Sequence, residues 1–151
     1  MIRKLLPLAI ILLALFACDQ DTYSQDENEI RDIIYDISRD FSWNEIEGIM
    51  EHAHPDYLHD GMYDYQLRLL WQDRLANYDL LACDVTNVDI QGDYATVHMV
   101  MNFESSEGSY SYPEPETSGD ASFFHYDYNY GEWLLYGNQL YNRESNSNPR
   151  K

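Results

Sequence analysis

The spacing of apolar residues changes near residue 80, and this change limits the folds that the chain can adopt. Before residue 80, apolar residues recur three and four positions apart, which is the period of one face of an α-helix. After it, apolar and polar residues alternate, as they do in a β-strand with one buried face. A run of helices followed by a run of strands predicts an α+β fold.

Three helices are predicted in the first half of the chain. Residues 24–27 (SQDE) have the form of a capping box, in which a serine and a glutamate satisfy free backbone amides at a helix start. The residues that follow place one apolar face on this helix: Ile30, Ile33, Ile34, Ile37 and Phe41. Residues 42–45 (SWNE) repeat the capping pattern and predict a second helix, which Pro55 should end because proline disfavours helical geometry at the preceding residue. Residues 67–78 predict a third helix.

The second half of the chain predicts two β-hairpins. Residues 85–103 alternate on both sides of Gly92-Asp93 and predict a long first hairpin. Residues 121–140 predict a second hairpin around Asn129-Tyr130-Gly131. Residues 104–119 are polar, acidic and interrupted by proline and glycine, which favours an extended connection. The expected domain, residues 26–141, therefore packs amino-terminal helices on a curved antiparallel sheet of about four strands, and residues 142–151 form a flexible tail.

The order of these elements resembles the nuclear-transport-factor-2-like superfamily, which is also called SnoaL-like or cystatin-like. The resemblance covers residues 26–141 and rests on the first helix (residues 29–41), the HPDY segment (residues 54–57) and the GEWLL turn into a strand (residues 131–135). It implies a sheet folded into a cone that the helices close, and a homodimer formed through the sheet. It implies no particular reaction, because a fold does not determine an activity.

The first eighteen residues resemble the signal peptide of a bacterial lipoprotein. A positive start and a short apolar run end in Leu15-Phe16-Ala17-Cys18, which is similar to a lipobox. The resemblance implies that Cys18 carries a lipid, including palmitate, and that residues 19–25 tether the domain to the extracytoplasmic (periplasmic) face of a membrane. Asp19 resembles the signal that retains such proteins in the inner membrane. The apolar run is shorter than the roughly 20 residues needed to span a bilayer.

The formal charge of −18 limits the partners of this chain. We predict that the chain does not bind nucleic acid, because such binding requires lysine and arginine side chains that neutralise phosphates. Anionic lipid head groups should also repel the domain. Such a charge keeps a protein soluble, and by itself it does not indicate a cationic partner. If Cys18 carries lipid, Cys83 has no partner for an intramolecular disulfide and is expected to be a buried thiol.

Two sets of side chains are candidates for a functional site. His125 and Asp127 are two residues apart on a predicted strand and should share a face, where a histidine acts as an acid or base near neutral pH. His98 lies on another strand and joins them as a catalytic candidate, because dehydratases of the resembled superfamily use His and Asp within the cone. The aromatic candidates for a ligand pocket are Tyr57, Trp71, Tyr78 and Trp133.

A third histidine group follows the second predicted helix. His52, His54 and His59, with Asp56 and Asp60, have a spacing that matches no known metal site. The prediction is that these histidines are exposed at a helix end and bind no metal. No cofactor is predicted either.

Three functions compete at this point. The leading hypothesis is a non-enzymatic, membrane-tethered domain that binds a small apolar or amphipathic ligand or a protein partner. The first alternative is a small isomerase or dehydratase that uses a His/Asp pair in the cone. The second is an acidic interaction or inhibitor lipoprotein. Outward-facing His98 and His125 would argue against the enzyme, and a cone filled by Trp71 and tyrosine side chains would favour the interaction class.

Overall fold

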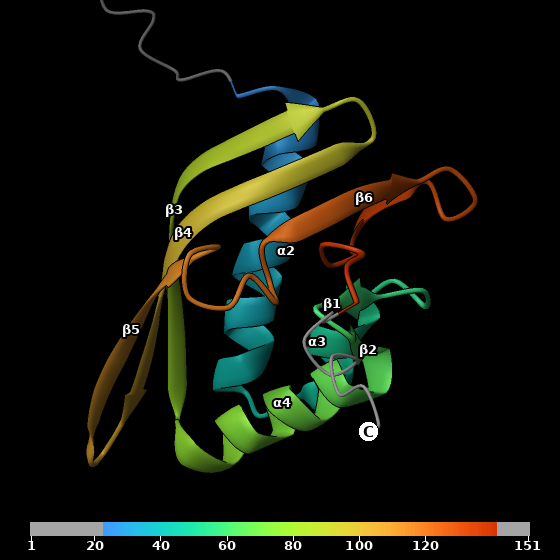
Figure 1. The fold of residues 1–151 in the computed structure, drawn as a ribbon. Coiled ribbons are helices and arrows are strands. Elements are labelled where there is room, and N and C mark those ends of the chain that lie inside the picture. Colours follow the sequence, from blue (N-terminus) through green and yellow to red (C-terminus); the bar gives the residue numbers. More distant parts are fainter. Residues whose placement is uncertain (1–22, 142–151) are drawn as a thin grey trace, which may run out of the picture.

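The structure is a computed structural model that describes residues 23–141. The predicted lipidation site at Cys18, residues 19–22 of the predicted tether and the predicted tail at 142–151 lie outside the described residues. Helices pack on one side of a curved antiparallel sheet (Figure 1), which confirms the predicted α+β class. Among the residues described, no helix has the length and apolar content needed to cross a bilayer.

The first helix, α2, spans Gln25–Ser42. The Ser24 hydroxyl accepts a hydrogen bond from the Glu27 amide at 3.1 Å, so the predicted cap at residues 24–27 is present. The Glu27 carboxylate does not complete the box but pairs with Arg31 at 2.9 Å. The buried apolar residues of α2 are Ile30, Ile34, Ile37 and Phe41, as the spacing predicted.

The second helix differs from its prediction in how it begins. α3 spans Ile46–Glu51 and has no side-chain cap. Residue Ser42 was expected to cap it, but α2 continues through Ser42, whose hydroxyl donates to the carbonyl of Ser38 at 3.0 Å. The chain turns instead at Asn44, where φ is +59°. Asparagine tolerates this left-handed geometry better than most residues.

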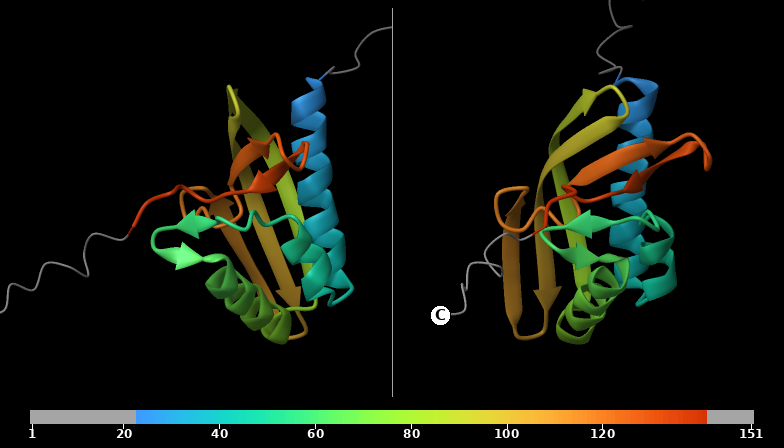
Figure 2. Two further views of the ribbon diagram at one scale, coloured as in Figure 1. Left: turned by 90° about the vertical axis from the view of Figure 1, so that its right-hand side faces the viewer. Right: turned by 45° about the vertical axis from the view of Figure 1, so that its right-hand side comes forward.

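The third helix, α4, spans Asp64–Asn77 and buries Leu67 and Trp71. A two-stranded sheet of β1 (Leu58–His59) and β2 (Met62–Tyr63) connects α3 to it. Figure 2 shows α2 running along the main sheet while α4 crosses near one end of it.

The main sheet has the strand order β3-β4-β6-β7. β3 (Leu80–Gln91) pairs with β4 (Tyr94–Ser105) along its length, which confirms the first predicted hairpin. β6 (Phe123–Asp127) pairs with β7 (Glu132–Leu135), which confirms the second.

A fifth strand lies where an extended connection was predicted. β5 (Gly108–Glu114) pairs with β4 from Met99 to Ser105, next to the shorter pairing of β4 with β6. The prediction was wrong here because acidic residues at both ends and prolines at the carboxyl-terminal end obscure a short Ser/Tyr alternation. Tyr110 and Tyr112 stand opposite Phe103 and Met101, and these cross-strand contacts favour a strand.

The concave side of the sheet is filled by large side chains. Alternate residues of β4 point into it, from Ala95 to Phe103, and are buried. The ring of Phe41 contacts Trp71 and Phe103 at centroid distances of 6.0 and 5.4 Å, and Trp71 has no exposed surface. Each such side chain contributes about 1.5–3 kcal/mol through burial. The described interior is therefore a packed core.

Candidate functional site

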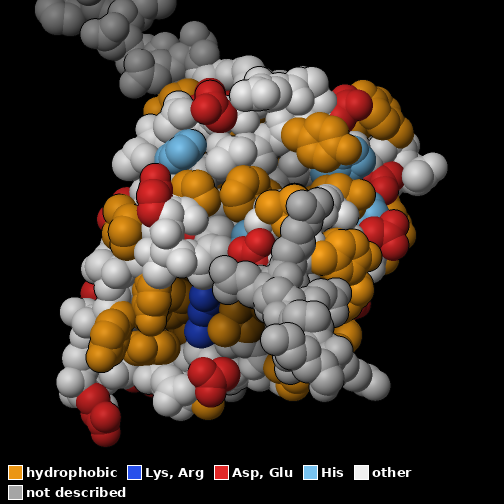
Figure 3. Space-filling view, viewed as in Figure 1, with side chains coloured by type: hydrophobic (Ala, Val, Ile, Leu, Met, Phe, Trp, Pro, Cys, Tyr) orange, Lys and Arg blue, Asp and Glu red, His pale blue; other side chains and the backbone are white. Residues whose placement is uncertain are grey.

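A pocket of about 500 Å³ opens between α4 and the β4–β5 hairpin. We call it the rim pocket and define it by Asp73, Arg74, Tyr78, Glu107, Tyr110 and Tyr112, which line it with four other residues. Figure 3 shows a basic side chain on this face, between two groups of hydrophobic side chains. The pocket lies outside the packed core, between a helix and the last strand on its side of the sheet.

Three tyrosines form the aromatic wall of the rim pocket. The rings of Tyr110 and Tyr112 lie 6.4 Å apart at 29°, and Tyr78 meets the edge of Tyr110 at 6.1 Å. Burial and the neighbouring Tyr112 raise the pKa of Tyr78, so its phenol is neutral at pH 7. Tyrosine rings arranged in this way offer apolar area and π-faces to a ligand.

Arg74 forms the floor of the rim pocket, and its charge is already balanced. Its two terminal nitrogens donate to the two carboxylate oxygens of Asp120 at 2.6 and 3.1 Å. The guanidinium also lies over the ring of Trp71 at 4.7 Å. Only 1 % of Asp120 is exposed. Burial opposes ionisation of this carboxyl, but Arg74 and the Ser118 hydroxyl together with His59 hold the pKa of Asp120 below its ordinary value.

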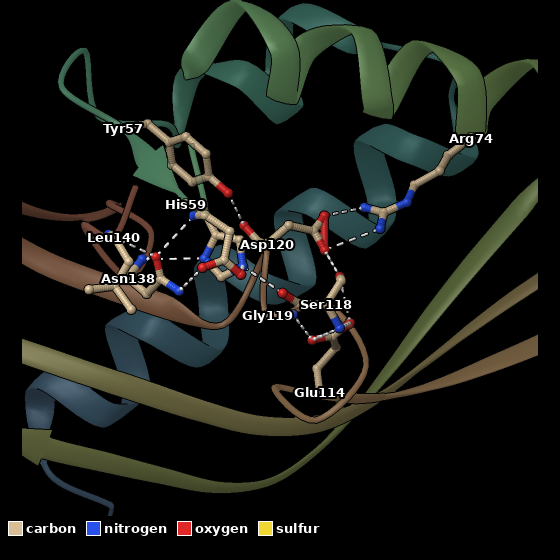
Figure 4. Close-up of polar contacts among 10 residues, drawn as sticks. Tyr57, His59, Arg74, Glu114, Ser118, Gly119, Asp120, Asn138 and Leu140 are labelled. Atoms are coloured by element: carbon tan, nitrogen blue, oxygen red, sulfur yellow. Dashed lines mark hydrogen bonds and ion pairs between the residues drawn. The ribbon is translucent and has the colours of Figure 1, made fainter. Parts of the chain in front are cut away.

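A buried network behind the floor holds Asp120 in place (Figure 4). The Ser118 hydroxyl lies between the carboxylates of Asp120 and Glu114, 2.9 Å from the latter. The Glu114 carboxylate also accepts hydrogen bonds from the backbone amides of Ser118 and Gly119. Because Glu114 is buried, its pKa is raised. These bonds close the loop after β5 around the Glu114 carboxylate.

Two side chains from the segment before α4 complete this network. The Tyr57 hydroxyl donates to the backbone carbonyl of Asp120 at 2.8 Å, and His59 Nε2 lies 2.5 Å from the carbonyl of Ser118. A hydrogen bond to that carbonyl requires a proton on Nε2, which leaves Nδ1 to accept the Asn138 amide at 3.3 Å. The loop after β5 is therefore anchored to both α4 and β1.

The catalytic candidate Asp127 forms a hydrogen bond with His54, not with His125, the histidine with which the sequence analysis paired it. His54 Nε2 lies 2.8 Å from Asp127, while His54 Nδ1 accepts the backbone amide of Asp56 at 2.9 Å. The hydrogen bond from His54, together with the Asn129 amide, lowers the pKa of Asp127. A general base needs a ring nitrogen that can reach its substrate. Both ring nitrogens of His54 already form hydrogen bonds, so neither is free to act as a base. The His54–Asp127 pair instead links the segment after α3 to the β6–β7 turn.

The other two catalytic candidates lie apart from each other. His125 is between the rings of Tyr94 and Tyr136, at 4.7 and 4.8 Å, and its buried Nδ1 has no hydrogen-bond partner among residues 23–141. His98 alternates along β4 with core residues, so it points to the face of the sheet opposite the helices, where Glu116 lies 3.9 Å away. No contact within the described region joins His98 to His125 or Asp127.

The four aromatic candidates divide between the core and the rim pocket. Tyr57, Trp71 and Trp133 are buried in the core, and Trp133 Nε1 donates to Asp26 at 3.2 Å. Tyr78 lines the rim pocket. The helical spacing of Trp71 and Tyr78 did not distinguish these two positions.

The histidines after α3 are not all exposed, which corrects the prediction for His54 and His59. Both are buried because residues 53–59 pair with the chain after β6: the His54 amide donates to Leu135 at 2.8 Å and the Leu58 amide to Tyr136 at 3.1 Å. Burial lowers the pKa of His52. Within residues 23–141, no three His, Cys, Asp or Glu side chains form a group that could hold a metal ion.

Sequence reasoning missed Arg74 and Asp120. One signal was available for Arg74, because residues 23–141 contain four arginines and no lysine, so each cation there is conspicuous. No local spacing indicated that Asp120, which is 46 residues away, would pair with it.

Comparisons with known proteins identify the fold. No protein-family model and no curated protein matches the sequence. A substituted form of the protein Rd1NTF2_05 superposes with a TM-score of 0.58 at 12% identity, over 74% of this chain and 96% of that chain. A protein of unknown function with a cystatin-like fold from Nostoc punctiforme superposes with a TM-score of 0.54 at 17% identity, over 76% and 89%. At these identities the likeness shows the fold alone, and the chain has the cone fold of the cystatin-like, NTF2-like structures.

Proposed function

We propose that this domain is a non-enzymatic binding module whose rim pocket takes an amphipathic cation. The observation that carries the proposal is the combination of a tyrosine wall, two carboxylates at the opening and an arginine floor whose charge is balanced by Asp120. A cation over tyrosine rings gains roughly 0.5–2 kcal/mol, more where water is excluded. Asp73 and Glu107 are both exposed, so their carboxylates are hydrated. They attract a cation to the opening without first losing that hydration.

The pocket favours a cation over an anion for reasons of charge. Arg74 could attract an anion, but both of its terminal nitrogens already donate to Asp120. An anion would also approach the carboxylates of Asp73 and Glu107 in a chain whose net charge is −18. An anion in the pocket would be repelled by these two carboxylates, and water would weaken that repulsion without removing it.

Binding is favoured over catalysis by the state of His54 and His98. His54 has no free ring nitrogen, and His98 lies on the opposite face of the sheet from the packed core. The filled interior supports a partner that binds at the rim rather than a small substrate enclosed in the cone.

The test uses two matched aromatic probes, benzyltrimethylammonium and benzenesulfonate, titrated by NMR. We expect the cation to bind and the anion not to bind. Tyr110→Ala should weaken cation binding about two- to fivefold, since it removes one ring of the wall. Tyr94→Ala is the matched control, because Tyr94 is similarly exposed but does not line the pocket. Stronger binding of benzenesulfonate, or equal effects of the two substitutions, would show that the proposal is wrong.

We also propose that a lipid on Cys18 tethers this module to a membrane. The support is the leader and lipobox pattern that ends at Cys18. The intact mass of protein extracted from membranes should correspond to a chain that begins at residue 18 and carries acyl groups. A Cys18→Ser variant should lack the added mass. A native chain with an unmodified Cys18 would contradict the tether without affecting the rim pocket.

A further inference from the structure

β5 leaves one edge of the main sheet unpaired. It pairs only with β4, so its other edge faces outward. The carbonyl of Pro113 accepts the Thr117 amide at 3.0 Å, which shows that the backbone of Pro113 points away from β4. Backbone direction alternates along an antiparallel strand. The amides and carbonyls of Ser109 and Ser111 therefore point outward as well, and they form a short free edge.

The first five residues of β5 contain none of the usual features that block an edge strand. Natural edges are protected by lysine, proline, bulges or inward charges. Residues 108–112 (GSYSY) contain no charge and no proline, and Pro113 limits the edge at its end. The free edge thus has room to pair with two or three residues of an extended segment.

The rim pocket adjoins this edge. Tyr110 and Tyr112 stand opposite the buried residues Phe103 and Met101, so they project to the concave side, where they line the pocket. A strand added to β5 would lie about 4.7–4.9 Å away, with alternate side chains on the same side as Tyr110. One of those side chains would lie at the opening of the pocket.

We propose that the ligand of the rim pocket is a lysine or arginine side chain of a partner protein, presented by an extended segment that adds to the edge of β5. This rests on the proposed function and names its ligand. The backbone bonds would supply affinity that is independent of sequence, and the pocket would select the basic residue. A lysine side chain has an apolar stem for the tyrosines and a charge for Asp73 and Glu107.

Charge complementarity selects a basic partner rather than a second copy of this chain. Residues 23–141 contain no lysine, and every arginine there is already paired with a carboxylate: Arg31, Arg39, Arg68 and Arg74. A second copy would bring Glu107 and the rest of an acidic surface against the same charges. The described residues therefore have no unpaired arginine or lysine to offer to a copy's rim pocket.

The test measures binding of short peptides to the full chain in detergent by fluorescence anisotropy. The probes are Thr-Val-Lys-Val-Thr, the same peptide with Glu in place of Lys, and a version with N-methyl groups on the amides of one edge. We expect the lysine peptide to bind, the glutamate peptide to bind at least tenfold more weakly, and backbone methylation on the pairing edge to weaken binding about three- to tenfold.

Substitution of Ser111 tests the edge in the protein itself. Ser111→Pro removes one outward amide while leaving the backbone bonds to β4, and it should weaken binding of the lysine peptide about three- to tenfold. It also removes the hydrogen bond from the Ser111 hydroxyl to Asn102 of β4, which Ser111→Ala removes as well. Ser111→Ala is the matched control and should change binding less than twofold. Neither substitution should change the binding of benzyltrimethylammonium. If Ser111→Pro does not fold, the methylated peptide tests the same bonds.

The outcomes separate this inference from the proposed function. If benzyltrimethylammonium binds but the lysine peptide does not, the inference is wrong and the rim pocket is still a cation site. If neither binds, both are wrong. Concentration-dependent dimers that Ser111→Pro abolishes would assign the edge to a second copy and would also overturn the inference.

Discussion

Replacing Asp120 by asparagine is expected to lower the free energy of unfolding by about 3–5 kcal/mol. The side chain of Arg74 is only 12% exposed, and Asp120 supplies its balancing charge through two hydrogen bonds. Asparagine offers one acceptor oxygen and no charge, so the substitution leaves a partly buried cation uncompensated. Urea denaturation at pH 7 measures the loss.

Two further variants show whether the loss comes from the charge pair. Asp89→Asn makes the same change at an exposed position of β3 and should alter stability by less than about 0.5 kcal/mol. Combining Asp120→Asn with Arg74→Met should recover part of the loss, because no unpaired charge is then buried. Equal losses in Asp120→Asn and Asp89→Asn would contradict the assigned role of the pair.

The difference between the native chain and Asp120→Asn should also shrink in acid. The folded pKa of Asp120 is lower than that of an unfolded aspartate, which is about 3.9. Its contribution is therefore present above pH 3.9 and is lost as the pH falls through the folded value. Glu114 has the opposite effect on the pH dependence of stability, because its pKa is raised in the folded state. Its contribution to stability is lost as the pH rises through the folded pKa.

Much of the fold could be predicted because its signals are local. The change of period near residue 80 separates helices from strands, and Gly92-Asp93 marks the turn of a hairpin whose pairing extends from Leu80 to Glu104. β5 could not be predicted in the same way. Its residues alternate only between serine and tyrosine, and strand preference depends on the neighbouring strand more than on the segment itself.

The candidate site could be predicted only in part because its contacts are distant in sequence. Tyr78 was named for a ligand pocket on its residue type and helical position, and it lines the rim pocket. Arg74 meets Asp120 across 46 residues, and His54 meets Asp127 across 73. Such pairs depend on how β5 and β6 return to the helices, and no spacing rule within one element contains that information.

Trp71→Ala is expected to lower the free energy of unfolding by about 3–5 kcal/mol, as large-to-small changes in a packed core do. Trp71 has no exposed surface and packs against Phe41 and Phe103, whose rings also contact each other. Urea or thermal denaturation measures the change. The matched control is Trp43→Ala, because Trp43 is 65% exposed and contacts Arg39 at the surface. It should cost less than about 1 kcal/mol.

Trp71→Phe separates the packing of this ring from its polar atom. Trp71 Nε1 is buried and has no hydrogen-bond partner among residues 23–141. Burying this donor without a partner therefore destabilises the native fold by about 1–3 kcal/mol. Phenylalanine removes that cost and keeps most of the surface under Arg74, and the loss should be clearly smaller than that of Trp71→Ala. If the two losses were equal, the indole nitrogen would have to make a bond that stabilises the core. The floor of the rim pocket would then rest on that bond as well as on Asp120.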